Sequence, residues 1–143
     1  MRSKINLPYY KTWIEISKSS LIYNLKQFRK IVGGRSKVAC VIKANAYGHD
    51  LLSVTEILKK EAGWFCVDNL DEGLNVRTIT QKPILILGYI PLIRLREAIE
   101  NNLSFVVYNW ETLKKIKKIK LPLKAKIHLK IETGLNRQGV TLN

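Results

Sequence analysis

Residues 38–50 read VACVIKANAYGHD, an apolar run that ends on Lys43 and continues into a turn of small residues. Residues 38–42 are apolar on both faces, which is typical of a strand buried in a parallel sheet. A lysine at the end of such a strand faces a crevice, where desolvation favours the neutral, nucleophilic amine. The stretch therefore predicts a parallel α/β fold in which Lys43 can form a Schiff base with a carbonyl group. The alternative is a lysine that simply extends to solvent from the strand end.

The rest of the chain alternates short apolar runs with helical patterns. Strands are predicted over residues 13–16, 37–42, 64–67, 84–87, 103–107 and 124–131, and helices over residues 20–32, 51–61, 71–78, 91–101 and 110–118. Ser19 or Ser20 is the expected cap of the first helix, and Pro91 is expected to open the fourth. Strands that alternate with helices indicate βαβ units and a parallel sheet.

The spacing of these units indicates a barrel. A repeat of about 20 residues fits a (βα)8 TIM-type barrel, which needs eight strands and about 250 residues. Residues 37–131 supply about five of the eight strands. We therefore expect a partial barrel preceded by a short N-terminal strand. We also expect the chain to be part of something larger, because an open sheet edge exposes unpaired backbone groups. The alternative is a smaller doubly wound α/β domain.

Composition is that of an ordered globular protein. The chain has 143 residues, of which 46% are hydrophobic, enough for one domain with a core. No apolar run approaches the roughly 20 residues that span a bilayer. The N-terminus lacks the apolar core of a signal peptide, so we expect a cytoplasmic protein with no membrane partner. Cys40 and Cys66 fall in predicted strands and are expected to be buried free thiols.

The net charge of +14 suggests a nucleic-acid-binding protein as one hypothesis. Much of the excess lies in one segment, at Lys114, Lys115, Lys117, Lys118, Lys120, Lys124 and Lys126. Leu113, Ile116 and Ile119 are spaced three apart there, which predicts an amphipathic helix with a solvated lysine face. No aromatic residues are interleaved to stack on bases. We therefore expect no nucleic-acid partner. No group of residues has metal-ligand spacing either, so no metal is expected.

Two motifs carry a family resemblance. Residues 41–49, VIKANAYGH, resemble the segment around the cofactor lysine of bacterial alanine racemases, which are fold-type III pyridoxal-phosphate (PLP) enzymes. Asp50 departs from that motif, where the family usually has glycine. Residues 127–139, IHLKIETGLNRQG, resemble a later strand-and-turn motif of the same family. Weaker matches lie in the expected order at residues 13–16, 71–73 and 83–88. The resemblance covers essentially the whole chain, and two long motifs in order are specific.

The resemblance implies site residues. Lys43 would hold PLP, and its freed amine would act as a base on one face of the substrate's α-carbon. Tyr47 matches a tyrosine that contacts the cofactor phosphate. Arg137 matches an arginine near the phenolic oxygen of the cofactor and the substrate carboxylate. Lys130 matches a lysine that is carbamylated in many members. Leu87 matches a residue that packs near the cofactor ring, although core packing is its alternative.

Topology and nearby charges bear on these assignments independently of the family resemblance. The predicted topology places Lys43 and Arg137 at the carboxyl ends of the first and fifth barrel strands, hence on one rim. Glu132 offers Lys130 a carboxylate partner as an alternative to carbamylation. His49 and His128 are expected to be structural.

The resemblance also implies an organisation and an activity. Residues 1–17 would form a strand that packs on a C-terminal β domain absent from this chain, and residues 18–143 an incomplete PLP-binding barrel. A full-length relative interconverts L- and D-alanine for peptidoglycan as a homodimer, with a tyrosine of the C-terminal domain as second base. We therefore expect an N-terminal fragment of an alanine racemase that is inactive alone. The alternatives are another fold-type III racemase, for serine or lysine, and a non-catalytic PLP-binding barrel.

Overall fold

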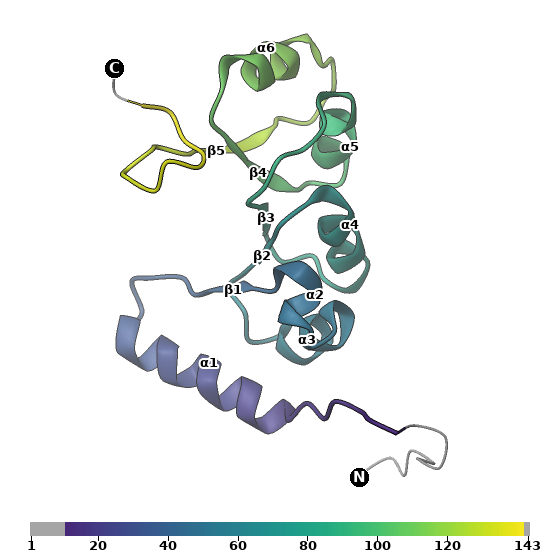
Figure 1. Cartoon of the computed structure of the whole chain (residues 1–143), viewed down its shortest axis with the longest axis vertical. Helices are drawn as coiled ribbons and strands as arrows, with labels where there is room; N and C mark the ends of the chain where they lie inside the picture. The colour runs from purple at the N-terminus through teal and green to yellow at the C-terminus, as the bar shows by residue number, and fades with distance from the viewer. Residues whose placement is uncertain (1–10, 142–143) are drawn as a thin grey trace.

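A five-stranded parallel sheet forms the centre of the protein in the computed structural model, which describes residues 11–141 (Figure 1). The strands lie side by side in chain order: β1 (Ala39–Val41), β2 (Trp64–Val67), β3 (Ile84–Ile86), β4 (Ser104–Val107) and β5 (Lys126–Leu129). All neighbouring pairs are parallel. A doubly wound sheet would reverse its strand order at a switch point. This order never reverses, so the partial barrel is confirmed and the doubly wound alternative is wrong.

Helices connect the strands. They are α1 (Lys18–Val32), α2 (Lys43–Tyr47), α3 (Leu51–Leu58), α4 (Leu70–Ile79), the 3₁₀ turn η1 (Leu92–Arg94), α5 (Leu95–Glu100) and α6 (Trp110–Lys118). Helices α3 to α6 lie along one side of the strands in Figure 1. Parallel strands with helices on the outside make the wall of a (βα) barrel.

Apolar side chains between the strands and these helices form the core. The largest of them on the strands are Phe65 and Phe105, which are almost completely buried, and the helices contribute residues such as Val76 and Leu95. Burying one such side chain contributes about 1.5–3 kcal/mol. The cysteines are free thiols as predicted, with Cys66 buried and Cys40 half-buried. Burial raises the pKa of the Cys40 thiol to about 11.

The sheet is curved, and the face that points away from helices α3 to α6 is its inner face. Strand register aligns Val41 with Cys66, and Cys66 with Leu85, on this inner face. Trp64 on β2 and His128 on β5 are separated by β3 and β4 in the sheet, yet their rings meet edge to face with centroids 5.8 Å apart. The sheet must therefore bend into an arc, as the wall of a closed barrel does. The packing role predicted for His128 is confirmed.

The N-terminal segment differs from the prediction. Residues 13–16 form no strand, and Trp13 and Ile14 are exposed. A strand needs a neighbouring strand to complete its hydrogen bonds, and none pairs with this segment within the described residues. Residues 1–10, the rest of the predicted N-terminal strand domain, lie outside the residues that the structure describes.

Two helix starts also differ. Ser17 caps α1 in place of Ser19 or Ser20, and its Oγ accepts a hydrogen bond from the Ser20 N–H at 3.2 Å. The helix predicted over residues 91–101 is divided into η1 and α5. Pro91 has extended ψ of 134°, so it precedes the first turn and does not open it.

Both edge strands of the sheet are exposed in the described part of the chain, although just beyond β5 Val140 pairs with the backbone of Lys130 and Glu132. All four residues of β5 are exposed, and β1 exposes Ala39 and Val41. No described helix packs over the outer side of β5, which leaves Leu129 60% exposed. None of the described helices has the length and apolar character needed to cross a membrane.

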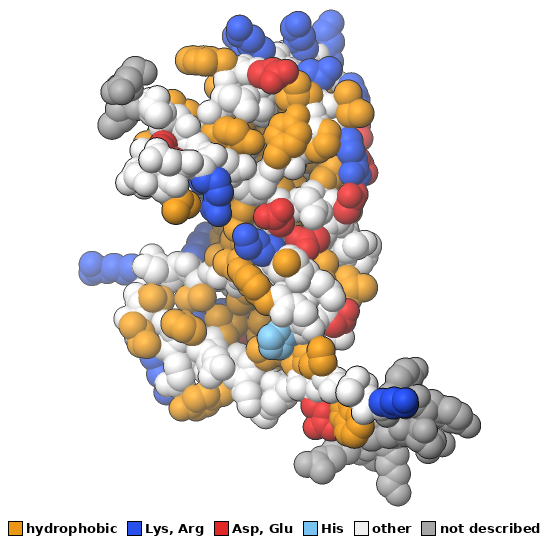
Figure 2. Space-filling model, viewed as in Figure 1, with side chains coloured by type: hydrophobic (Ala, Val, Ile, Leu, Met, Phe, Trp, Pro, Cys, Tyr) orange, Lys and Arg blue, Asp and Glu red, His pale blue; other side chains and the backbone are white. Residues whose placement is uncertain are grey.

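The lysine-rich segment forms the predicted amphipathic helix. Leu113 and Ile116 of α6 pack against the core. The last turn of α6 carries Lys115, Lys117 and Lys118, and basic side chains gather over α6 at the top of Figure 2. A cluster of positive charge therefore lies at the end of the molecule that carries α6.

Candidate functional site

Lys43 lies at the carboxyl edge of the sheet, two residues after β1 ends. Its Nζ is 3.7 Å from Oδ1 of Asp68, the residue that follows β2. The Lys43 side chain is 33% exposed and that of Asp68 54% exposed. The predicted desolvation of the amine is therefore wrong, because water and a carboxylate both reach it. An exposed ion pair of this length is weak. The Lys43 amine is therefore accessible to a small molecule that reacts with amines.

The chain turns left-handed directly after Lys43. Residues 44–47 all have φ between 52° and 55°. This region costs an L-residue about 1–2 kcal/mol, and a run of such residues is rare. The Ala46 N–H donates to the carbonyl of Ile42 at 2.8 Å, and the Gly48 N–H to that of Asn45 at 3.0 Å. Strain of this kind persists only where the surroundings fix it.

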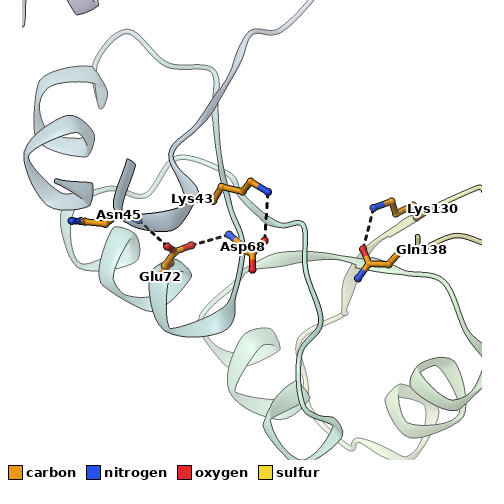
Figure 3. A network of polar contacts seen from close by, with 6 residues as sticks. All are labelled: Lys43, Asn45, Asp68, Glu72, Lys130 and Gln138. Atoms are coloured by element: carbon orange, nitrogen blue, oxygen red, sulfur yellow. Dashed lines mark hydrogen bonds and ion pairs between the residues drawn. The ribbon is translucent and has the colours of Figure 1, made fainter. Parts of the chain in front are cut away.

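Glu72, in the first turn of α4, connects this turn to the next loop (Figure 3). Its Oε1 accepts a hydrogen bond from the Asn45 N–H at 3.2 Å, and its Oε2 one from the Asp68 N–H at 2.9 Å. Oδ1 of Asn45 in turn accepts from the Leu51 N–H at 2.8 Å. Bonds from N–H groups to a carboxylate are charge-assisted and strong. One carboxylate thus fastens together the loops that follow β1 and β2.

Three more residues lie near the same edge. The Tyr47 side chain is 62% exposed at the end of the left-handed turn. Nδ1 of His49 lies 3.0 Å from the carbonyl oxygen of Ala46, a structural contact of the kind predicted. Leu87, which follows β3, is half-buried. By strand alternation it lies on the inner face with Leu85.

The loop after β3 approaches Asp68 closely. The Gly88 N–H donates to the Asp68 carbonyl at 2.8 Å. A Cβ at position 88 would lie 2.5 Å from that oxygen, closer than any side chain can approach. Asp68 is therefore fixed on two sides, by the carboxylate of Glu72 and by the backbone of Gly88.

Arg137 lies in the loop after β5 and is exposed. The Glu132 carboxylate organises this loop by accepting hydrogen bonds from the Gly134 N–H at 2.6 Å and the Arg137 N–H at 3.3 Å. Hydrogen bonds from backbone N–H groups, that of Asn136 above all, hold the pKa of Glu132 below its usual range. The alternative in which Glu132 pairs with Lys130 is wrong, because the carboxylate serves the backbone of its own loop.

Lys130 contacts Gln138. Its Nζ donates to Oε1 of Gln138 at 3.1 Å, and both side chains are partly buried. Gln138 is next to Arg137 in the chain, so this bond ties the end of β5 to the arginine loop. In Figure 3 the amines of Lys43 and Lys130 point toward one another from opposite sides of the view. Both lysines follow the carboxyl ends of parallel strands, so they share one rim of the sheet.

Sequence reasoning missed Asp68, Glu72 and Gln138. Asp68 had a signal that could have found it, because it follows an apolar strand just as Lys43 does. Asp71 and Glu72 are acidic residues in the first turn of α4, a pattern that indicates a helix start but not the bonds from Glu72 to Asn45 and Asp68. Gln138 stood within a quoted motif, but nothing in the sequence indicated its contact with Lys130.

Comparison with known proteins places the chain in a family. Residues 16–143 match the family described as alanine racemase, N-terminal domain. The chain belongs to the alanine racemase family. Alanine racemase 1 of Oceanobacillus iheyensis is 37% identical over 136 residues, which cover 92% of this chain and 36% of the relative. The family and its N-terminal region were both predicted correctly.

Solved structures of racemases share the fold. An alanine racemase from Clostridium difficile 630 is similar with a TM-score of 0.87 and 36% identity, over 93% of this chain and 36% of that one. A histidine racemase from Leuconostoc mesenteroides is similar with a TM-score of 0.83 and 30% identity, over 93% of this chain and 37% of that one. The chain therefore spans about a third of the length of the relatives it matches.

Proposed function

We propose that this chain is the cofactor-carrying part of a PLP-dependent alanine racemase, an isomerase, and that Lys43 holds the cofactor. The observation that carries the proposal is the position of Lys43, an accessible amine at the carboxyl end of the first barrel strand. Active sites of (βα) barrels are built at this end of the strands. Relatives named alanine racemase support the substrate.

The residues at this rim fit a PLP group. The Lys43 amine is engaged only in a weak ion pair, so it is free to react with an aldehyde. Leu85 and Leu87 give the inner face of the sheet apolar surface at β3, two strands from β1, and a flat heterocycle requires such a surface. Arg137 provides a planar cation on the same rim for anionic groups.

The roles of the chain's own residues follow from their chemistry. Bound PLP would supply the electron sink for the charge that forms when the α-proton leaves. Lys43 would act on one face of the α-carbon, accepting the proton in one direction of the reaction and donating it in the other, while the second base would serve the opposite face. Arg137 would bind the substrate carboxylate, and Tyr47 would donate a hydrogen bond to the cofactor phosphate. Leu87 would pack against the ring.

Lys130 is proposed as the site of carbamylation. A carbamate there would be an anion beside the arginine loop and would orient Arg137. In the present structure the Lys130 amine donates to Gln138, and the carbamate would replace that bond. Intact-mass measurement in bicarbonate buffer would show one added CO2 on wild type and none on Lys130→Arg.

For the whole protein we propose interconversion of L- and D-alanine for peptidoglycan, in the cytoplasm, by a homodimer without nucleic-acid or membrane partners. The second base would come from the part of the protein that corresponds to the two thirds of the relatives not matched by this chain. On this proposal the 143-residue chain binds cofactor but forms no D-alanine. The histidine racemase has the same fold over the region that this chain covers. This supports the proposal that the residues which select the substrate, whether alanine, serine or lysine, lie outside this region.

The test is covalent trapping. Adding PLP and then borohydride should label Lys43 in preference to other lysines, as mapped by peptide mass spectrometry. Lys43→Ala should abolish that label. The matched control is Lys59→Ala, because Lys59 is 32% exposed and also pairs with a carboxylate, Glu56. Wild-type labelling spread equally over Lys43 and Lys59 would contradict the proposal.

A further inference from the structure

The left-handed turn needs an external support. Residues 44–47 each sit in a backbone region unfavourable to side-chain-bearing residues. The turn's own hydrogen bonds join Ile42, Ala46 and Gly48 to neighbours within the same turn. They close the turn, and a further bond from the Ile42 N–H to the Cys66 carbonyl at 2.8 Å holds its first residue to β2.

Asn45 binds the middle of the turn to the two helices that follow. Its side-chain Oδ1 accepts from the Leu51 N–H at 2.8 Å, which ties the turn to the start of α3. Its backbone N–H donates to Oε1 of Glu72 at 3.2 Å, which ties the turn to α4. The Glu72 side chain is half-buried, so it has little freedom to swing away.

Both oxygens of Glu72 are used. While Oε1 binds Asn45, Oε2 accepts from the Asp68 N–H at 2.9 Å (Figure 3). Asn45 is two residues from Lys43, and Asp68 carries the carboxylate 3.7 Å from the Lys43 amine. A single side chain thus fixes the backbone on both sides of the Lys43–Asp68 pair.

We infer that Glu72 is a positioning residue for Lys43: it holds the left-handed turn in place and so fixes where the Lys43 amine lies on the rim. The inference rests on the proposed role of Lys43. The position requires two acceptor oxygens at the reach of a glutamate. A glutamine has one acceptor, and its amide NH2 would face a backbone N–H.

Glu72→Gln tests the inference with Glu111→Gln as control. Glu111 is the acidic first-turn residue of α6, is exposed, and bonds to no other described side chain. Each substitution removes one negative charge. Glu72→Gln should slow PLP labelling of Lys43 by about tenfold, because the variant loses one hydrogen bond to a charged group and the turn is held less firmly. Labelling of Lys59 should not change. Glu111→Gln should leave both rates unchanged.

The direction in which the labelling rate changes separates a positioning role of Glu72 from a simple charge effect. If Glu72 acted only as a nearby anion that stabilises the ammonium ion, its removal would speed labelling of Lys43. Faster or unchanged labelling in Glu72→Gln therefore overturns the inference. Absence of preferential Lys43 labelling in wild type is a different outcome, since it overturns the proposed function.

A measurement on the wild type needs no variant. Amide N–H groups held in hydrogen bonds exchange slowly with solvent. In a hydrogen-exchange experiment followed by NMR, the Asn45 and Asp68 amides, which donate to the two oxygens of Glu72, should both be protected, as should the Thr112 amide, which is bonded to the Asn109 side chain. Rapid exchange of the Asn45 or the Asp68 amide would show that Glu72 does not bridge them and would overturn the inference even if Glu72→Gln failed to fold.

Discussion

At the scale of single residues, the carboxylate of Asp68 opposes the reaction that we propose for Lys43. Attack on an aldehyde requires the neutral amine, and a carboxylate 3.7 Å away stabilises the ammonium ion. The pair is exposed, so its strength is at most about 1 kcal/mol. Asp68→Asn should therefore raise the rate of PLP labelling at Lys43 near pH 7 by about two- to fivefold.

The control for Asp68→Asn is Glu56→Gln, which removes the carboxylate paired with Lys59 and should leave the Lys43 rate unchanged. Slower labelling of Lys43 in Asp68→Asn would mean that the carboxylate orients the amine more than it holds its proton. Peptide mapping after borohydride reduction gives both rates in one experiment.

The sequence was sufficient to predict that Lys43 follows the end of a strand, because a lysine that ends an apolar run stands out by itself. Its environment was predicted less well. Asp68 is 25 positions away in the chain and approaches only because β1 and β2 are neighbours in register. The exposed amine, the Glu72 bridge and the Lys130–Gln138 bond all depend on such distances between strands, which residue patterns do not contain.

At the scale of elements, the loop after β3 is set by the contact between Gly88 and Asp68. A methyl group at position 88 would lie 2.5 Å from the Asp68 carbonyl oxygen, so one of the two loops must move. Gly88→Ala should lower the free energy of unfolding by about 1–3 kcal/mol, as overpacking does. Urea denaturation followed by circular dichroism measures this change.

Gly34→Ala is the matched control for Gly88→Ala. A Cβ at Gly34 would meet nothing within 4 Å, and its φ is not positive. Its unfolding free energy should stay within about 0.5 kcal/mol of wild type. Equal stability of the two variants would show that the loop after β3 adapts to a side chain and does not hold Asp68.

Strongly periodic elements were predictable, and strained ones were not. The strand β2 and the helix α6 have the predicted bounds, because a strand and an amphipathic helix each have a clear period. Residues 44–47 were predicted only as a turn, since a left-handed run of non-glycine residues goes against their own preference. Residues 13–16 carry a strand pattern without a neighbouring strand to complete it.

At the scale of the whole molecule, the curvature of the sheet brings the two ends of the candidate site toward one inner face. Lys43 and Arg137 follow β1 and β5, the two lateral edges of the sheet. The contact between Trp64 and His128 shows that these edges bend toward the same inner face. The order of the strands was evident from the sequence, whereas their curvature follows from packing on both faces.

Net charge also acts on the whole molecule. With 25 Lys and Arg against 11 Asp and Glu, the charge is +14, and much of it lies near α6 (Figure 2). Self-repulsion destabilises a compact state, while exposed ion pairs such as Arg29–Glu61 and Arg96–Glu100 contribute little to stability. Repulsion should therefore dominate the response of the protein to salt.

Raising NaCl from about 20 mM to about 300 mM should increase the thermal unfolding midpoint by a few degrees, because the screening length falls from over 20 Å to below 10 Å. Replacing Lys115 and Lys118 with Gln should raise the midpoint at low salt and reduce its dependence on salt, since both lysines lie in the last turn of α6. Replacing Lys59, which is paired with Glu56, should have no such effect. A midpoint that falls with salt would mean that the ion pairs outweigh the excess positive charge.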